Sequence, residues 1–100
     1  MLTYEAVNRR IEENRDAIKK YGVNRLGVFG STARNEQNAE SDIDILAEFK
    51  KGKKTFDNYM DLKFFLERLF NRKVDLVTAE AIKPSLKTAI LESVKYASAI

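Results

Sequence analysis

The sequence predicts an α/β fold in which a small mixed sheet is flanked by helices, and three observations lead to this prediction. Short apolar segments that suit strands alternate along the chain with longer amphipathic segments that suit helices. Glycine and proline stand at several boundaries between these segments. No internal repeat, low-complexity stretch or linker divides the sequence, so we expect residues 1–100 to form one domain.

The first half of the chain predicts two helices and two strands. Thr3 suits the N-cap of the first helix, and apolar residues recur at helical spacing from there until Gly22 offers a stop. The short apolar range 25–29 predicts a buried strand, and a helical segment over 31–35 follows it. Apolar residues alternate over 42–49, which predicts a second strand with one buried face.

The second half adds a long helix, a third strand and a final helix. Two loops are also expected. A polar loop over 35–41 precedes the second strand, and a lysine-rich loop over 50–54 precedes the long helix. The range 56–70 predicts a helix that is apolar around much of its circumference, and 73–78 predicts the third strand. Pro84 suits the first position of the last helix. The expected order is therefore α, β, α, β, α, β, α.

Composition narrows the chemistry that this protein can perform. The content of 44% hydrophobic and 33% charged residues is typical of a globular protein, and no segment suits a membrane span or a signal peptide, so we expect a cytoplasmic protein. The sequence has no cysteine and no histidine, which excludes thiolate nucleophiles, histidine bases and Cys/His zinc sites. Carboxylates, hydroxyls, lysine or arginine must carry any catalysis.

Three aspartates are candidates for a metal site. Asp42 and Asp44 stand two residues apart on a predicted strand, so their carboxylates leave the same face. Asp75 joins them if the third strand lies beside the second. Each close pair of carboxylates would repel by roughly 3 kcal/mol, which a bound cation would relieve. Ligands that are all oxygen favour Mg²⁺ first and Mn²⁺ second, and these ions usually bind phosphate oxygens as well.

A second pattern suits phosphate binding. The strand over 25–29 ends at Gly30, where the backbone can approach an anion, and a helix follows at Ser31, which adds a hydroxyl donor. Arg34 lies one turn further on and adds a guanidinium. An acidic metal site and an anion-binding turn together favour phosphoryl or nucleotidyl transfer.

Each of these features also has a purely structural interpretation. Alternating Asp and Ile residues are, taken alone, more often a half-buried strand, and a Gly-Ser turn before a helix is an ordinary cap. The lysines of 50–54 suit a solvated turn, although their charge and the net charge of +3 also suit an acidic partner or a nucleic acid. The apolar residues of 56–70 suit the core first and an interface second.

The order and spacing of the motifs resemble those of a known superfamily. Gly30-Ser31, ten intervening residues and Asp42-Ile43-Asp44-Ile45 resemble the signature of the DNA polymerase β-like nucleotidyltransferases. Nearly the whole chain is similar to the minimal nucleotidyltransferase (MNT) proteins, whose motifs match residues 28–34, 41–46 and 73–78 in the expected order. The resemblance implies the nucleotidyltransferase fold.

The resemblance also implies roles for six residues. Asp42 and Asp44 match the acids that bind the metal ions, expected to be two Mg²⁺ with Mn²⁺ as a substitute. Asp75 matches the third acid of the catalytic and metal-binding set, which helps to deprotonate the attacking hydroxyl. Gly30 and Ser31 match the pair that binds the triphosphate. Arg34 matches a motif position that we expect to contact phosphate or nucleotide.

The biological role implied by this resemblance is that of an antitoxin. MNT proteins are encoded beside a HEPN protein, a helical ribonuclease toxin, and several add AMP from ATP to a tyrosine of that toxin. We therefore expect a protein adenylyltransferase that forms a hetero-oligomer with a HEPN toxin, without a membrane or a nucleic acid as direct partner. Two alternatives stay open: an antitoxin that occludes the toxin without catalysis, and nucleotidyl transfer to a small molecule or an RNA.

Overall fold

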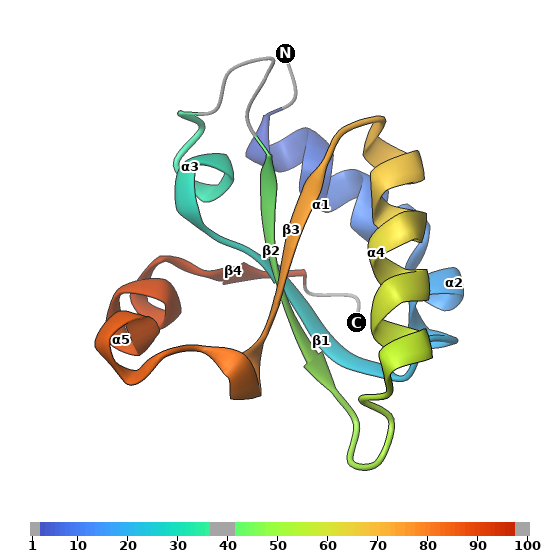
Figure 1. The fold of residues 1–100 in the computed structure, drawn as a ribbon. Coiled ribbons are helices and arrows are strands. Elements are labelled where there is room, and N and C mark those ends of the chain that lie inside the picture. Colours follow the sequence, from blue (N-terminus) through green and yellow to red (C-terminus); the bar gives the residue numbers. More distant parts are fainter. Residues whose placement is uncertain (1–2, 37–41, 98–100) are drawn as a thin grey trace.

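A mixed β-sheet forms the centre of the computed structural model, which describes residues 3–36 and 42–97 (Figure 1). Within these residues the strands are β1 (Val23–Val28), β2 (Ile43–Phe49), β3 (Val74–Thr78) and β4 (Lys95–Tyr96). Their order across the sheet is β3-β2-β1-β4. β1 is antiparallel to β2 and to β4, whereas β2 and β3 are parallel. The predicted small mixed sheet with flanking helices is confirmed.

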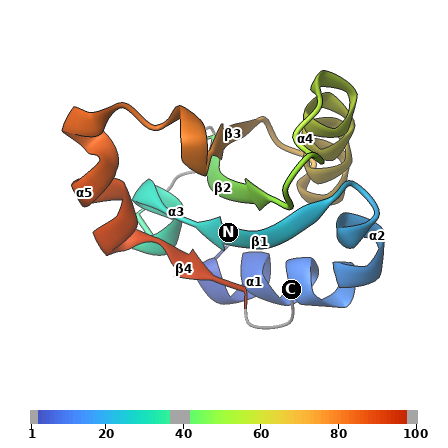
Figure 2. The ribbon, with the colours of Figure 1, turned by 90° about the horizontal axis from the view of Figure 1, so that it is seen from below.

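Three helices cover one face of this sheet and enclose the hydrophobic core (Figure 2). They are α1 (Tyr4–Glu13), α2 (Arg15–Lys19) and α4 (Phe56–Phe70). Alternate side chains of β2 and β3 point into this core, and Ile43, Ile45 and Leu76 are buried there. The intervening side chains of the same two strands therefore leave the opposite face of the sheet.

The long helix α4 divides its apolar residues between the core and the surface. Leu62, Leu66 and Phe70 are buried against the sheet, as expected for the inner face of an amphipathic helix. Phe56 and Phe64, by contrast, have exposed fractions of 77% and 47%. Neither α4 nor any other helix in the two described ranges has the length and apolar character that crossing a membrane requires.

The opposite face of the sheet has a lighter cover. It consists of the one-turn helix α3 (Gly30–Ala33) and of α5 (Pro84–Ser93), which follows β3 through a short 3-10 turn, η1 (Ala79–Ala81). Figure 1 shows both helices on the other side of the sheet from α4. None of residues 84–93, all of which the structure describes, is buried. This face is therefore where polar side chains of the central strands remain accessible.

The element boundaries agree with the sequence except at a few places. Thr3 caps α1, accepting a hydrogen bond of 3.1 Å from the Ala6 backbone N–H, and Pro84 occupies the first turn of α5. The prediction of one continuous helix up to Gly22 was wrong. Asn14 interrupts it because its side-chain amide donates to the Arg10 carbonyl at 2.8 Å, which competes with regular helical bonding.

Two further elements were not expected, the 3-10 turn η1 and the two-residue strand β4. β4 pairs with the edge of β1, and its two residues are too few to give a periodic signal in the sequence. Most of the predicted loop over 35–41 lies outside the described residues.

Candidate active site

Asp44 and Asp75 are direct neighbours on the lightly covered face of the sheet. β2 and β3 pair in a parallel register that sets Asp44 opposite Asp75, so their Cα atoms lie about 5 Å apart and their side chains leave the same face. Asp42 precedes the first residue of β2. Asp44 is half-buried, whereas Asp42 and Asp75 are exposed. The structure thus brings β3 beside β2, the condition on which the sequence argument for Asp75 depended.

The three carboxylates influence one another electrostatically. Burial is the main cause that raises the pKa of Asp44, and the charges of Asp75 and Asp42 raise it further. A hydrogen bond from the Ser31 backbone N–H and the charge of Arg34 oppose this shift. Asp44 therefore interacts both with the other two acids and with the turn after β1, and it is the central acid of the candidate site.

The glycine turn packs directly against the central acid. Gly30 has a φ of +62°, a left-handed conformation in which residues with a side chain are strained. A Cβ at this position would collide with the carboxylate of Asp44. The approach is fixed by the sheet itself, because the Phe29 backbone N–H donates to the Asp44 carbonyl at 3.1 Å. The two features that the sequence suggested separately form one site.

The helix after this turn is shorter than predicted, and this changes the physical argument for phosphate binding. α3 spans four residues instead of the expected 31–35, so its macrodipole is small. An anion here would depend on individual backbone N–H groups and on the Ser31 hydroxyl. Arg34 is paired with Glu36 at 3.3 Å, and both side chains are more than half exposed. Its role as a phosphate contact stays a prediction, and it would require exchanging this surface partner.

Thr32 supplies a prediction about stability. Its side chain is fully buried in α3, and its hydroxyl has no hydrogen-bond partner among the described residues. Because a buried polar group without a partner is destabilising, we expect Thr32→Val to raise the free energy of unfolding by about 1 kcal/mol. Urea denaturation measures this change. Thr88→Val on the exposed surface of α5 is the control, and a loss of stability in Thr32→Val would show that the hydroxyl has a partner.

The aspartates are chemically suited to a divalent cation. All their donor atoms are carboxylate oxygens, as Mg²⁺ prefers. The charges of Asp75 and Asp42 add to burial in raising the pKa of Asp44, and a bound cation would offset this electrostatic cost. Across residues 3–36 and 42–97, however, no three acidic side chains are close enough as they stand to hold one ion together. Metal binding at Asp42, Asp44 and Asp75 would require side-chain rotations, which the exposed Asp42 and Asp75 permit.

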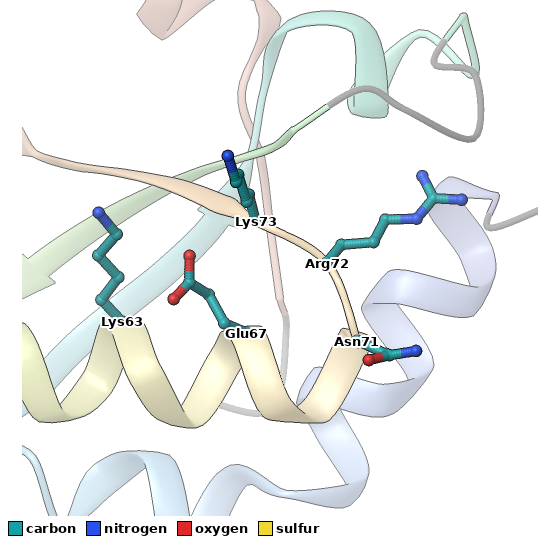
Figure 3. A pocket seen from close by; sticks show the side chains of 5 residues that line it. All are labelled: Lys63, Glu67, Asn71, Arg72 and Lys73. Atoms are coloured by element: carbon teal, nitrogen blue, oxygen red, sulfur yellow. The ribbon is translucent and has the colours of Figure 1, made fainter.

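A separate pocket of about 550 Å³ lies where α4 leads into β3. Its lining residues are Lys63, Glu67, Asn71, Arg72 and Lys73. Figure 3 shows Lys63 and Lys73 on either side of Glu67, with Arg72 directed away from them. The Glu67 carboxylate accepts a hydrogen bond of 3.1 Å from the Val74 backbone N–H and so fixes the start of β3. None of the predicted site residues lines this pocket. We therefore interpret its side chains as stabilising the fold and not as binding a ligand.

The lysine-rich loop lies away from the acids. It follows the last residue of β2, whereas Asp42 precedes the first, so the two lie at opposite ends of the strand. The lysines of 50–54 are exposed, and Lys54 pairs with Glu80 at 3.4 Å. This arrangement agrees with the interpretation of the loop as a solvated turn.

A groove beside Asp75 was not identified from the sequence. It has a volume of about 310 Å³ and lies between β3 and α5. Its apolar lining comes mainly from Phe29, Val77, Ile82, Leu86 and Ile90. One signal was available in advance: Val77 stands two residues after Asp75 and so shares its face of the strand. The part of the lining that α5 supplies depends on where this helix packs, and no pattern in the sequence indicated that position.

The fold and the site together define an enzyme that transfers a phosphate-linked group, with paired acids on adjacent strands and a glycine turn against the central one. The sequence model of the nucleotidyltransferase domain family matches residues 10–97. The chain belongs to this family and is a nucleotidyltransferase, as the motifs predicted.

Two relatives extend this assignment to most of the chain. A candidate protein adenylyltransferase of Methanocaldococcus jannaschii is 50% identical over 74 residues, which cover 74% of this chain and 78% of the relative. The protein adenylyltransferase MntA of Thermococcus cleftensis is 32% identical over 97 residues, which cover 96% of this chain and 97% of the relative.

Solved structures have the same fold. A candidate minimal nucleotidyltransferase is 32% identical and superimposes with a TM-score of 0.82 over 95% of this chain and 96% of its own. An MNT antitoxin complex with a tri-AMPylated HEPN toxin from Shewanella oneidensis contains a chain that is 17% identical. That chain superimposes with a TM-score of 0.65 over 93% of this chain and 73% of its own. At this low identity the second similarity establishes the fold alone.

Proposed function

We propose that this nucleotidyltransferase transfers AMP from ATP to a tyrosine hydroxyl of a HEPN toxin and thereby acts as its antitoxin. The observation that carries the proposal is the position of Asp44, which touches the Gly30 turn on one side and faces Asp75 on the other. The relative named protein adenylyltransferase MntA and the fold shared with an MNT antitoxin bound to an AMPylated toxin support the choice of AMP and of a toxin acceptor.

The proposed reaction is an in-line displacement at the α-phosphorus of ATP. The tyrosine oxygen forms a bond to this phosphorus, and the bond from the α-phosphorus to the oxygen that bridges it to the β-phosphorus breaks, so that pyrophosphate leaves. Asp75 is the proposed acceptor of the tyrosine proton because it is exposed and lies on β3, which β2 separates from β1 and its turn. The turn at Gly30 and Ser31 would hold the triphosphate through backbone N–H groups and the Ser31 hydroxyl.

Mg²⁺ would be held by Asp42, Asp44 and Asp75, with Mn²⁺ as a substitute. When bound, it supplies charge neutralisation of the phosphates and a lower pKa for the attacking hydroxyl. The chain's own residues contribute position: Asp44 is fixed by the Ser31 N–H, while Asp42 and Asp75 can adjust from the surface. Arg34 would add positive charge near the phosphates once released from Glu36.

A labelling experiment tests this proposal. The protein is incubated with ATP labelled on the α-phosphate, Mg²⁺ and the protein encoded next to it, which the proposal expects to be of the HEPN type. We expect label to appear on the HEPN protein, to require Mg²⁺, and to be lost when the acceptor tyrosine is changed to Phe. ATP labelled on the γ-phosphate is the matched control and should leave the protein unlabelled. Label from the γ-position, or none from the α-position, would contradict AMP transfer.

A non-catalytic antitoxin is the second candidate function. It is favoured by the exposed aromatic side chains Phe56 and Phe64 on α4, which are able to contribute to a protein interface. Transfer to an RNA or to a small molecule has less support, because the lysine-rich loop that suggested it lies at the other end of β2 from the acids. Label on added RNA in the same assay would favour that third function.

A further inference from the structure

The groove between β3 and α5 opens directly onto one of the three acids. Asp75 forms part of its lining, and the remaining lining is mainly apolar. We call this cavity the acceptor groove, defined by Phe29, Val77, Ile82, Leu86 and Ile90. Leu86 also lines the groove, and its exposed fraction is 51%. This large apolar side chain is therefore not part of the hydrophobic core. An apolar cavity that ends at a carboxylate suits a ligand with an apolar body and one polar tip.

The order of the strands places Asp75, the acid that lines this groove, across Asp44 from the glycine turn. The Gly30 turn follows β1, Asp44 belongs to β2 and Asp75 belongs to β3, and these strands are consecutive in the sheet. The turn and Asp75 therefore flank Asp44 from opposite sides. In an in-line displacement the attacking oxygen and the leaving group also occupy opposite sides of the phosphorus. With pyrophosphate at the turn, the attacking oxygen arrives from the side of Asp75. The groove extends from Asp75 towards Phe29, the residue that precedes the turn.

We propose that the acceptor groove seats the aromatic ring of the acceptor tyrosine and places its hydroxyl oxygen at Asp75. This inference rests on the proposed function and adds to it the surface that selects the acceptor. Leu86 and Ile82 are then specificity-determining residues, since both contribute apolar surface to the groove from the segment after β3. The acceptor enters as a side chain of a partner protein, beside the exposed surface of α5.

The size and chemistry of the groove favour a tyrosine ring over the adenine of ATP. A volume of about 310 Å³ is at the lower limit of the roughly 300–1,000 Å³ typical of small-molecule pockets, which suits one ring better than a whole nucleoside. Adenine carries several ring nitrogens and an amino group that need hydrogen-bond partners when buried. The charged side chains in the lining are Asp75 and Lys83, and the other lining side chains are apolar.

The first test measures binding without requiring transfer. The protein, labelled with ¹⁵N, is saturated with Mg²⁺ and a non-hydrolysable ATP analogue, and N-acetyl-tyrosinamide is then added as the probe. We expect the amide signals of Val77, Ile82 and Leu86 to shift. Shifts confined to other parts of the protein, or no shifts, would overturn the inference. It would also be overturned if the ATP analogue itself occupied the groove and excluded the probe.

A pair of variants on α5 sharpens this test. Leu86→Ser removes apolar surface from the groove and should weaken binding of the probe about fivefold, while the affinity for the ATP analogue stays unchanged. Leu91→Ser is the matched control, because Leu91 is similarly exposed, at 43%, but does not line the groove. Equal effects of the two variants on the probe, or a loss of analogue affinity in Leu86→Ser, would contradict the proposal.

The same variants separate this inference from the proposed function. In the labelling assay Leu86→Ser should raise the KM for the HEPN protein and leave the KM for ATP unchanged. If the wild-type protein binds the probe in the groove but transfers no AMP, the proposed function fails while the groove remains an aromatic site. If AMP is transferred and Leu86→Ser changes neither probe binding nor the acceptor KM, the groove inference alone fails.

Discussion

The double substitution Asp42→Asn, Asp44→Asn is expected to lower AMP transfer to the HEPN protein by about 1,000-fold or more. Both changes keep the size of the side chain and remove its charge, so the site would lose two of its three carboxylates for Mg²⁺. The initial rate of labelling from α-labelled ATP measures the effect. The folded state should not suffer, because the charges that raise the pKa of Asp44 are already unfavourable to one another in the absence of a cation.

The control for this variant is Asp16→Asn, which changes an exposed aspartate on α2, far from the sheet face that carries the site. It should transfer AMP at the wild-type rate. Expression of the double variant together with the toxin distinguishes the two candidate functions. A catalytic antitoxin loses its protective effect in cells with this variant, whereas an occluding antitoxin retains it. Labelling at the wild-type rate by the double variant would refute the catalytic role of these residues.

Gly30→Ala is expected to lower AMP transfer by about 100-fold and to reduce stability as well. The left-handed backbone at this residue costs roughly 1–2 kcal/mol for alanine, and the new Cβ would displace the Asp44 carboxylate. Because a shift of about 1 Å in a reacting group can lower a rate by about two orders of magnitude, the activity should fall further than the stability alone would explain. Urea denaturation and the labelling assay measure the two effects separately.

Gly52→Ala is a matched control for Gly30→Ala. Gly52 also has a left-handed backbone, with a φ of +77°, but no atom lies within 4 Å of the position that its Cβ would take. This variant should therefore lose roughly 1–2 kcal/mol of stability from backbone strain and keep its activity. If both variants lose activity to the same extent, the contact between Gly30 and Asp44 has no specific importance for catalysis.

Much of this fold could be predicted from local patterns. The bounds of α4, Phe56–Phe70, agree with the apolar run in the sequence, and the alternation over 42–49 correctly assigned Ile43 and Ile45 to the core. These predictions succeeded because helical and strand periodicities depend on which side chains face the core. The break at Asn14 was missed because it results from one side-chain hydrogen bond, which leaves the hydrophobic period unchanged.

The sequence suggested the residues of the candidate site, but it did not show how they come together. The spacing of Asp42 and Asp44 predicted that both carboxylates leave one face of a strand, and the Gly30-Ser31 turn was visible in the sequence. In the structure β2 begins at Ile43, so of these two acids only Asp44 belongs to the strand. Which strands are neighbours depends on tertiary packing, and so the pairing of Asp44 with Asp75 came from the parallel register of β2 and β3. The acceptor groove needed α5 to be placed as well, and no periodic pattern specifies where a helix with an exposed surface will pack.

The sequence by itself therefore indicated the kind of enzyme: residue type and spacing favoured phosphoryl or nucleotidyl transfer, and the order of the motifs resembled that of the nucleotidyltransferases. The tertiary structure decided how these groups meet. The order β3-β2-β1 places Asp44 between Asp75 and the Gly30 turn. Because Gly30 has no Cβ, the turn can contact the Asp44 carboxylate. Distances between residues that are far apart in the chain depend on how the core packs, so local sequence patterns do not predict them.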